Sequence, residues 1–182
     1  MTPEDVQQAV AVAGEDSLPG GLSHVYPLGS RVNAAGRLEI GGCDAIELAR
    51  EFGTPAYVYA EDDMRERARA TLAAFARRTD RFEVLYASKA FPCTAALRLF
   101  ADAGLSCDVA SGGELHMALG AGFAPDRIYM HGNNKGEREL EAALAAEIGH
   151  VVVDSFDEMD RIERLVATEG VCLLYTSPSP RD

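Results

Sequence analysis

The feature of this sequence that most constrains its fold is a repeating unit of one apolar, strand-like run and one helix-like stretch. The repeat begins near residue 82 and recurs at intervals of roughly 22 residues. Each gap between the runs, except the last, holds a pattern typical of an amphipathic helix. The apolar runs are residues 82–87, 105–110, 127–131, 150–154 and 171–175. Regular alternation of strands and helices predicts an α/β fold with a parallel sheet.

Two architectures fit this alternation, a (β/α)8 barrel and an open doubly wound sheet. Continuous apolar runs such as residues 150–154 favour strands that are covered on both faces. Five repeats are visible, whereas a closed barrel of this type needs eight. Residues 176–182 form a short Ser- and Pro-containing tail with no closing helix. The sequence therefore leaves open a complete open sheet and a piece of a larger barrel.

The part of the chain before this repeat has a different pattern. Residues 1–20 are polar and contain a Pro-Gly pair near their end, so we expect them to be disordered. Residues 36–42 predict a short strand between turns. Asp44 is placed to cap a helix over residues 45–50, and Gly53 would end that helix.

A further strand and a long helix are predicted just before the repeat. Residues 56–59, Ala-Tyr-Val-Tyr, have the composition of a strand. The three acids at residues 61–63 suit the first turn of a helix, because the helix dipole favours negative charge at that end. We expect this helix to run to about residue 78.

Composition excludes several classes of function. The formal net charge is −12, with 29 acidic against 17 basic side chains, and such a surface repels nucleic acid. No apolar run approaches the length of about 20 residues that spans a membrane, and the first 20 residues lack the basic start of a signal peptide. The four cysteines form no CxxC pair and do not cluster with histidine, so we expect reduced thiols. We therefore expect a cytoplasmic protein without nucleic-acid or membrane partners.

Polar residues collect where the predicted strands end. In parallel α/β proteins the carboxyl ends of the strands carry the reactive groups. Lys89 and Lys135, the two lysines of the chain, both lie at such ends. Burial of Lys89 would favour the neutral amine that forms an imine with an aldehyde. The alternative is a structural lysine whose stem packs against the strand and whose amine reaches solvent.

Three further features follow neighbouring strands. Asp108 could pair with Lys89 or another cation, or it could start a turn or cap a helix. Gly112 and Gly113 could offer backbone N–H groups to an anion or form a tight turn. Residues 131–135, His-Gly-Asn-Asn-Lys, could contact a substrate or form a structural loop. No spacing of His, Cys, Asp or Glu predicts a metal site, and no nucleotide-binding or hydrolase motif occurs.

Five segments occur in an order that is found in one enzyme family. They are residues 52–59 (FGTPAYVY), 86–91 (YASKAF), 107–115 (CDVASGGEL), 127–135 (RIYMHGNNK) and 150–155 (HVVVDS). Together they closely resemble the diaminopimelate decarboxylase family, in the group of pyridoxal-phosphate decarboxylases built on an alanine-racemase-like barrel. The resemblance covers about residues 22–172, and the tail after about Cys172 does not continue it.

The resemblance implies a fold and a set of roles. It implies that residues 56–175 are about the first half of a (β/α)8 TIM-type barrel. It further implies that residues 21–55 belong to a second β-domain and to the entry of the barrel, and that residues 176–182 are a tail outside the family. Lys89 would hold pyridoxal 5'-phosphate as a Schiff base, with Asp108 and Glu114 nearby. The family's histidine that stacks on the cofactor lies on a later strand, so His131 does not take that role.

The implied reaction is the decarboxylation of meso-diaminopimelate to lysine, carried out by a homodimer of the full-length protein. The phosphate loop and the substrate-binding residues would lie beyond residue 182, so we expect the 182-residue chain to be inactive alone. A related decarboxylase that acts on ornithine or arginine is one alternative. An alternative of another class is a small α/β domain that binds a partner without catalysis, with Lys89 purely structural.

Overall fold

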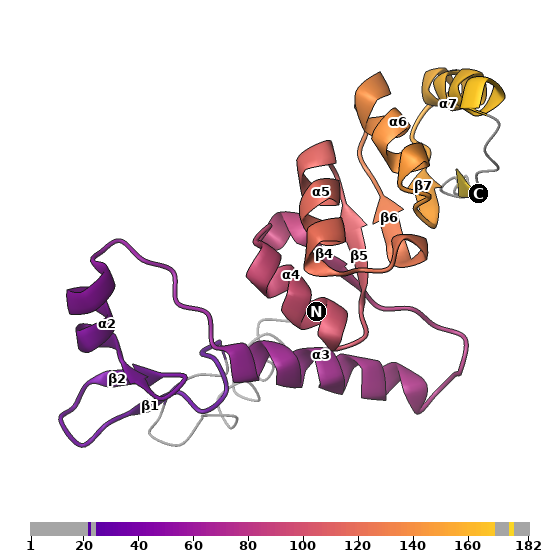
Figure 1. The fold of residues 1–182 in the computed structure, drawn as a ribbon. Helices are drawn as coiled ribbons and strands as arrows, with labels where there is room; N and C mark the ends of the chain where they lie inside the picture. Colours follow the sequence, from indigo (N-terminus) through magenta and orange to yellow (C-terminus); the bar gives the residue numbers. More distant parts are fainter. Residues whose placement is uncertain (1–21, 23–24, 170–174, 177–182) are drawn as a thin grey trace, which may run out of the picture. The chain divides into compact units, whose positions relative to one another are not determined.

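The computed structural model describes residues 22, 25–169 and 175–176, and the chain divides into two units, Met1–Arg67 and Ala68–Asp182 (Figure 1). The expected disorder of residues 1–20 and most of the expected tail lie outside the described residues. The division falls inside helix α3 (Glu61–Ala76). The presence of α3 confirms the predicted long helix. The expected boundary between residues 55 and 56 stays a prediction.

The described residues of the first unit form a small antiparallel sheet, a short helix and the start of α3. Its strands are β1 (Arg31–Val32), β2 (Leu38–Ile40) and β3 (Cys43–Asp44). Helix α2 (Ala45–Phe52) follows directly, and the side chain of Asp44 caps it by accepting a 2.8 Å hydrogen bond from the N–H of Ile46. Gly53 ends the helix with a φ of 80°, a value that favours glycine. The predicted strand within residues 36–42 and the helix capped by Asp44 are confirmed.

The predicted strand at residues 56–59 is wrong. These residues form an irregular segment that belongs to neither sheet of the described chain. Aromatic and β-branched side chains suit a strand, but a strand also needs a neighbouring backbone with which to pair. The side chain of Tyr57 is 93% exposed, so packing does not compensate here. Local composition alone therefore does not make this segment a strand.

The second unit contains a five-stranded parallel sheet whose strands lie side by side in sequence order. The strands are β4 (Leu85–Ala87), β5 (Ser106–Val109), β6 (Ile128–Met130), β7 (His150–Val152) and β8 (Tyr175–Thr176). A doubly wound sheet reverses its strand order at a switch point, whereas a barrel adds each strand beside the previous one. The sheet is therefore part of an α/β barrel, as the resemblance implied.

One face of this sheet is buried and the other is partly exposed. Cys107, Val109, Ile128 and Met130 have no exposed surface, whereas Asp108, between two of them, points to the other face and is partly exposed. The helices that follow the strands are α4 (Thr94–Asp102), α5 (Gly112–Ala121), α6 (Glu137–Ala145) and α7 (Phe156–Glu169) (Figure 1). Helices cover the outer face of a barrel wall, and the expected cover on both faces is not found among the described residues.

Helix α7 corrects the expectation that the last gap of the repeat holds no helix. Its start is stabilised by two side chains. Ser155 Oγ accepts a 3.2 Å hydrogen bond from the N–H of Glu158, and the Glu158 carboxylate accepts one of 3.2 Å from the N–H of Asp154. This is close to a capping box, for which the spacing Ser-x-x-Glu is the sequence signal. Ser155 and Glu158 have this spacing in the sequence.

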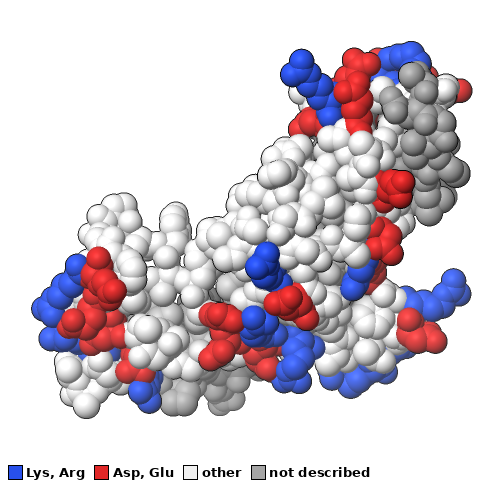
Figure 2. Space-filling view, viewed as in Figure 1, with Lys and Arg blue, Asp and Glu red and all other residues white. Residues whose placement is uncertain are grey.

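Acidic and basic side chains lie close together on the surface (Figure 2). On α3, Arg65 pairs with Glu61 at 2.8 Å and Arg67 with Asp63 at 2.9 Å, each one helical turn apart. The Arg65–Glu61 pair is exposed and contributes little to stability, whereas the side chain of Asp63 is only 12% exposed. In the part of the chain that the structure describes, no helix combines the length and the apolar character of a membrane span.

Candidate active site

The predicted site residues lie at one edge of the parallel sheet. Lys89 lies in a short 3-10 turn, η1 (Ser88–Ala90), directly after β4. Ala87, the last residue of β4, is the register partner of Asp108 on β5, so Lys89 and Asp108 lie at the same end of neighbouring strands. The side chain of Lys89 is exposed, which corrects the expectation that it is buried. The cause is the partly exposed inner face of the sheet, next to which this turn lies.

Glu114, in the first turn of α5, connects two strand ends. Its Oε2 accepts a hydrogen bond of 2.5 Å from Ser88 Oγ and one of 2.9 Å from the N–H of Ala110. Ser88 precedes Lys89 directly, and Ala110 directly follows β5. The carboxylate therefore holds the turn that carries Lys89 against the end of the neighbouring strand.

Asp108 pairs with His131 and not with Lys89. The two side chains come from the ends of β5 and β6, and His131 Nδ1 contacts Asp108 Oδ1. A proton on Nδ1 is donated to the carboxylate, which leaves Nε2 of the imidazole free of this contact. The Asp108 side chain is 19% exposed and that of His131 45%. The pair can hold a proton at this edge and fixes the orientation of the imidazole.

Lys135 is fully engaged in a buried contact. Its Nζ lies 2.7 Å from Glu158 Oε1 of α7, and the two side chains are 1% and 2% exposed. The ammonium also donates to the carbonyl of Val152 at 2.8 Å and to that of Gly132. The end of the His-Gly-Asn-Asn-Lys segment is therefore structural, whereas Asn133 and Asn134 remain exposed.

A comparison with protein families shows which family this chain belongs to. Residues 61–178 match the family described as pyridoxal-dependent decarboxylase, pyridoxal binding domain. The chain belongs to this family. The matched range includes Lys89, Asp108 and Glu114, and it ends two residues beyond β8. The position at which a tail outside the family begins stays a prediction.

Several named relatives are similar to this chain. The diaminopimelate decarboxylase of Bacillus methanolicus is 49% identical over 142 residues, which cover 78% of this chain and 33% of the relative. The crystal structure of diaminopimelate decarboxylase from M. jannaschii in complex with L-lysine matches with a TM-score of 0.74 and 30% identity, over 90% of this chain and 36% of that one. A lysine/ornithine decarboxylase from Vibrio vulnificus with putrescine matches with a TM-score of 0.60 and 25% identity, over 71% and 34%. The chain thus spans about one third of the length of these relatives.

The described residues include a lysine whose amine could bind pyridoxal phosphate, the cofactor of this family. An aldehyde is bound covalently by an accessible primary amine. Lys89 presents an exposed amine at the carboxyl edge of the sheet, where ligands bind in parallel α/β folds. Lys135 has its amine enclosed by a carboxylate and two carbonyls. Of the two lysines, Lys89 is therefore the one that fits pyridoxal phosphate.

The Gly112–Gly113 pair has a structural role at the start of α5. The N–H of Gly112 donates to Glu139 Oε1 at 2.7 Å, and the other oxygen of Glu139 accepts from the N–H of Gly136 at 2.9 Å. These bonds from Gly136 and Gly112 hold the pKa of Glu139 below its ordinary value. A Cβ on Gly112 would lie 3.3 Å from Glu139 Cγ, so glycine permits this approach. A carboxylate of the protein itself therefore takes the N–H that we considered for an external anion.

A polar cluster at the opposite end of the sheet was not found from the sequence. Glu83 accepts hydrogen bonds from Ser106 Oγ and from the Tyr129 hydroxyl, with the Arg127 guanidinium 3.8 Å away. Burial raises the pKa of Glu83, but the bonds from Ser106 and Tyr129 outweigh it and hold the pKa below its ordinary value. Burial and the Glu83 carboxylate raise the pKa of Tyr129 to about 12. In the sequence, the polar side chains of Arg127 and Tyr129 are two positions apart, a spacing that places both on one face of a strand.

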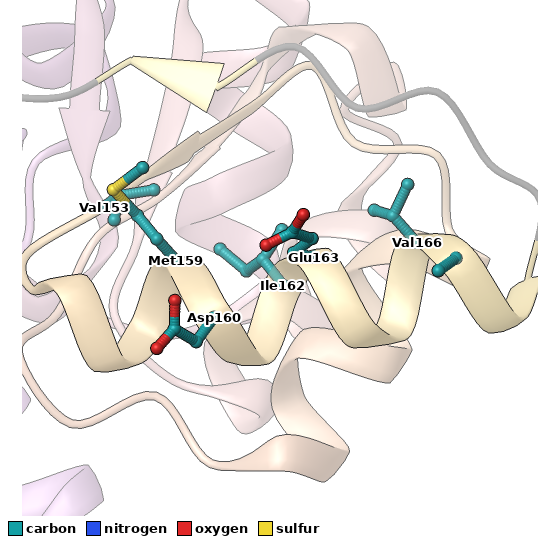
Figure 3. A pocket seen from close by; sticks show the side chains of 7 residues that line it. Val153, Met159, Asp160, Ile162, Glu163 and Val166 are labelled. Atoms are coloured by element: carbon teal, nitrogen blue, oxygen red, sulfur yellow. The ribbon is translucent and has the colours of Figure 1, made fainter.

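A pocket of about 530 Å³ lies along α7 and is separate from the candidate site (Figure 3). Met159, Ile162 and Val166 give it an apolar wall, and Asp160 and Glu163 add carboxylates. None of the predicted site residues lines it. In the described part of the chain, no three metal-binding side chains cluster together.

Proposed function

We propose that this chain carries the cofactor-binding lysine of a pyridoxal-phosphate-dependent decarboxylase, and that this lysine is Lys89. The observation that carries the proposal is that the two lysines differ in exposure and in pairing. Lys89 is exposed at the edge of the sheet where a ligand would bind, whereas Lys135 is 1% exposed and paired with Glu158. Membership of the pyridoxal-dependent decarboxylase family supports the same cofactor.

Each residue of the site has a proposed part in this function. When bound, pyridoxal 5'-phosphate supplies an electron sink for the electron pair that the loss of carbon dioxide leaves behind. Lys89 anchors the cofactor through its amine. Asp108 places a negative charge on the neighbouring strand end, where it favours protonated nitrogen nearby. His131 is oriented by Asp108 and its side chain is 45% exposed at the same edge, where its second ring nitrogen can hold or release a proton.

The proposed substrate of the full-length protein is meso-diaminopimelate, with lysine as the product. Relatives named diaminopimelate decarboxylase are 49% and 30% identical to this chain, and one of them is a complex with L-lysine. The second candidate is a decarboxylase of ornithine or arginine, and the lysine/ornithine decarboxylase from Vibrio vulnificus supports ornithine at the lower identity of 25%. The homodimer is a proposal that rests on the resemblance, and the location in the cytoplasm is a proposal that rests on the composition and the isolated cysteines.

The assignment of Lys89 is tested by reductive trapping. The 182-residue chain is incubated with pyridoxal phosphate and cyanoborohydride, digested and mapped by mass spectrometry. We expect the added mass on the peptide that contains Lys89 and none on the peptide that contains Lys135, because the amine of Lys135 is enclosed. Lys89→Ala should remove the label. Equal labelling of both lysines would contradict the assignment.

A substrate panel separates the two candidate reactions. The full-length protein is supplied with meso-diaminopimelate, ornithine and arginine in turn, and the release of carbon dioxide is measured. A preference for meso-diaminopimelate supports the first candidate. A preference for ornithine or arginine would replace it while leaving the role of Lys89 intact.

A further inference from the structure

We propose that Glu114 and Ser88 form a positioning pair that fixes the place of Lys89. This inference rests on the proposed function of Lys89 as the cofactor-binding residue. It assigns Glu114 a role through the backbone of the turn η1, and not a contact with the cofactor.

The contacts of Glu114 point to this role. A single oxygen, Oε2, accepts hydrogen bonds from Ser88 Oγ at 2.5 Å and from the N–H of Ala110 at 2.9 Å. The side chain of Ser88 is fully buried, so its hydroxyl has no access to water and depends on this acceptor. Hydrogen bonds to an ionised acceptor are stronger than those between neutral groups. One carboxylate thus joins three chain segments, η1, the end of β5 and the first turn of α5.

The turn that carries Lys89 needs such support. It is only three residues long, and a 3-10 turn has poorer hydrogen-bond geometry than an α-helix. The residue that precedes it, Ala87, supplies no side-chain cap. The Lys89 side chain is itself exposed, so the backbone of the turn fixes the point from which its flexible stem extends. The bond from Ser88, next in sequence to Lys89, therefore constrains this backbone directly beside Lys89.

The chain offers a matched control at the other end of the sheet. Ser106 is also fully buried and also donates its hydroxyl to a glutamate, Glu83. That pair lies at the amino ends of the strands, away from the turn that carries Lys89. Ser106→Ala removes a comparable hydrogen bond without touching the proposed positioning pair.

The experiment compares S88A, E114A, E114Q and S106A in the 182-residue chain. Three quantities are measured: hydrogen exchange of the amides in residues 88–91, the rate of reductive trapping of Lys89 by pyridoxal phosphate, and the denaturant midpoint. We expect S88A and E114A to speed exchange in the turn and to slow trapping by about tenfold. E114Q keeps an oxygen that can accept both bonds but lacks the charge, so its values should fall between those of E114A and the unchanged chain.

S106A should lower the denaturant midpoint while leaving exchange in residues 88–91 and the trapping rate unchanged. Normal exchange and trapping in E114A would overturn the proposal. A slow trapping rate in E114Q and E114A alike, with the turn still protected, would also overturn it, because that pattern indicates direct contact of Glu114 with the cofactor. If E114A does not fold, S88A and E114Q decide the question. If Lys89 of the unchanged chain is not trapped, the proposed function fails, and the exchange data still test the pair.

Discussion

Lys135 and Glu158 form an ion pair that is almost completely removed from water. Removing two charges from water costs several kcal/mol for each, and this cost is offset only when both charges are well paired. Lys135 Nζ also donates to the carbonyls of Val152 and Gly132, so three acceptors surround the ammonium. The pair joins the segment after β6, the end of β7 and the first turn of α7, and it explains why this lysine is not a second reactive amine.

We predict that Lys135→Met lowers the free energy of unfolding by about 3–5 kcal/mol, because it leaves the carboxylate of Glu158 buried without its partner. The double variant Lys135→Met/Glu158→Leu should recover most of this loss, since it removes both charges. Urea unfolding of the chain measures both values.

Arg65→Ala is the control for this prediction. Arg65 pairs with Glu61 at the surface, and its loss should cost less than about 1 kcal/mol. A loss in Lys135→Met no greater than that in Arg65→Ala would show that the buried pair does not hold these segments together.

At the scale of single elements, the start of α7 depends on Ser155. Its Oγ accepts from the N–H of Glu158, which would otherwise have no partner in the first turn of the helix. We predict that Ser155→Ala lowers the free energy of unfolding by about 1 kcal/mol. Ser155→Asp should keep most of the stability, because aspartate is also a good cap. Denaturant unfolding measures both variants, and an equal loss in the two would contradict a capping role.

The elements that could be predicted from the sequence are those whose causes are local. Asp44 lies two residues before the N–H that it caps, so the sequence predicts α2. The Ser-x-x-Glu spacing at Ser155 is an equally local signal for the start of α7. The segment 56–59 was wrongly predicted because a strand depends on a distant partner.

In the candidate site, the position of Lys89 has a local cause, whereas the partners of the site residues depend on distant parts of the chain. The place of Lys89 at a strand end could be predicted from the βα repeat, and the family resemblance supplied its role. The partners of the site could not be predicted in this way. Ser88 and Glu114 are 26 positions apart, and Asp108 and His131 are 23 apart. Contacts at these separations depend on which strands and helices become neighbours in the folded chain, and the local pattern around one residue does not contain that information.

At the scale of the whole molecule, the described sheet has a buried outer face and a partly exposed inner face. In a closed barrel the inner face is packed with side chains from all eight strands, and the loops at the carboxyl end enclose the site. Here five strands form the sheet, and the chain spans about one third of the length of its relatives. The exposure of Lys89 is a direct consequence of this open inner face.

We therefore predict that the 182-residue chain binds pyridoxal phosphate through Lys89 but releases no carbon dioxide from meso-diaminopimelate. Binding needs an accessible amine, which the chain has, whereas rapid decarboxylation also needs a site that orients the carboxylate and excludes water. Carbon dioxide release from the purified chain, with the full-length protein under the same conditions as the positive control, measures the difference. Clear turnover by the chain that Lys89→Ala abolishes would contradict the prediction, and it would mean that the carboxyl edge of these five strands is sufficient for the chemistry.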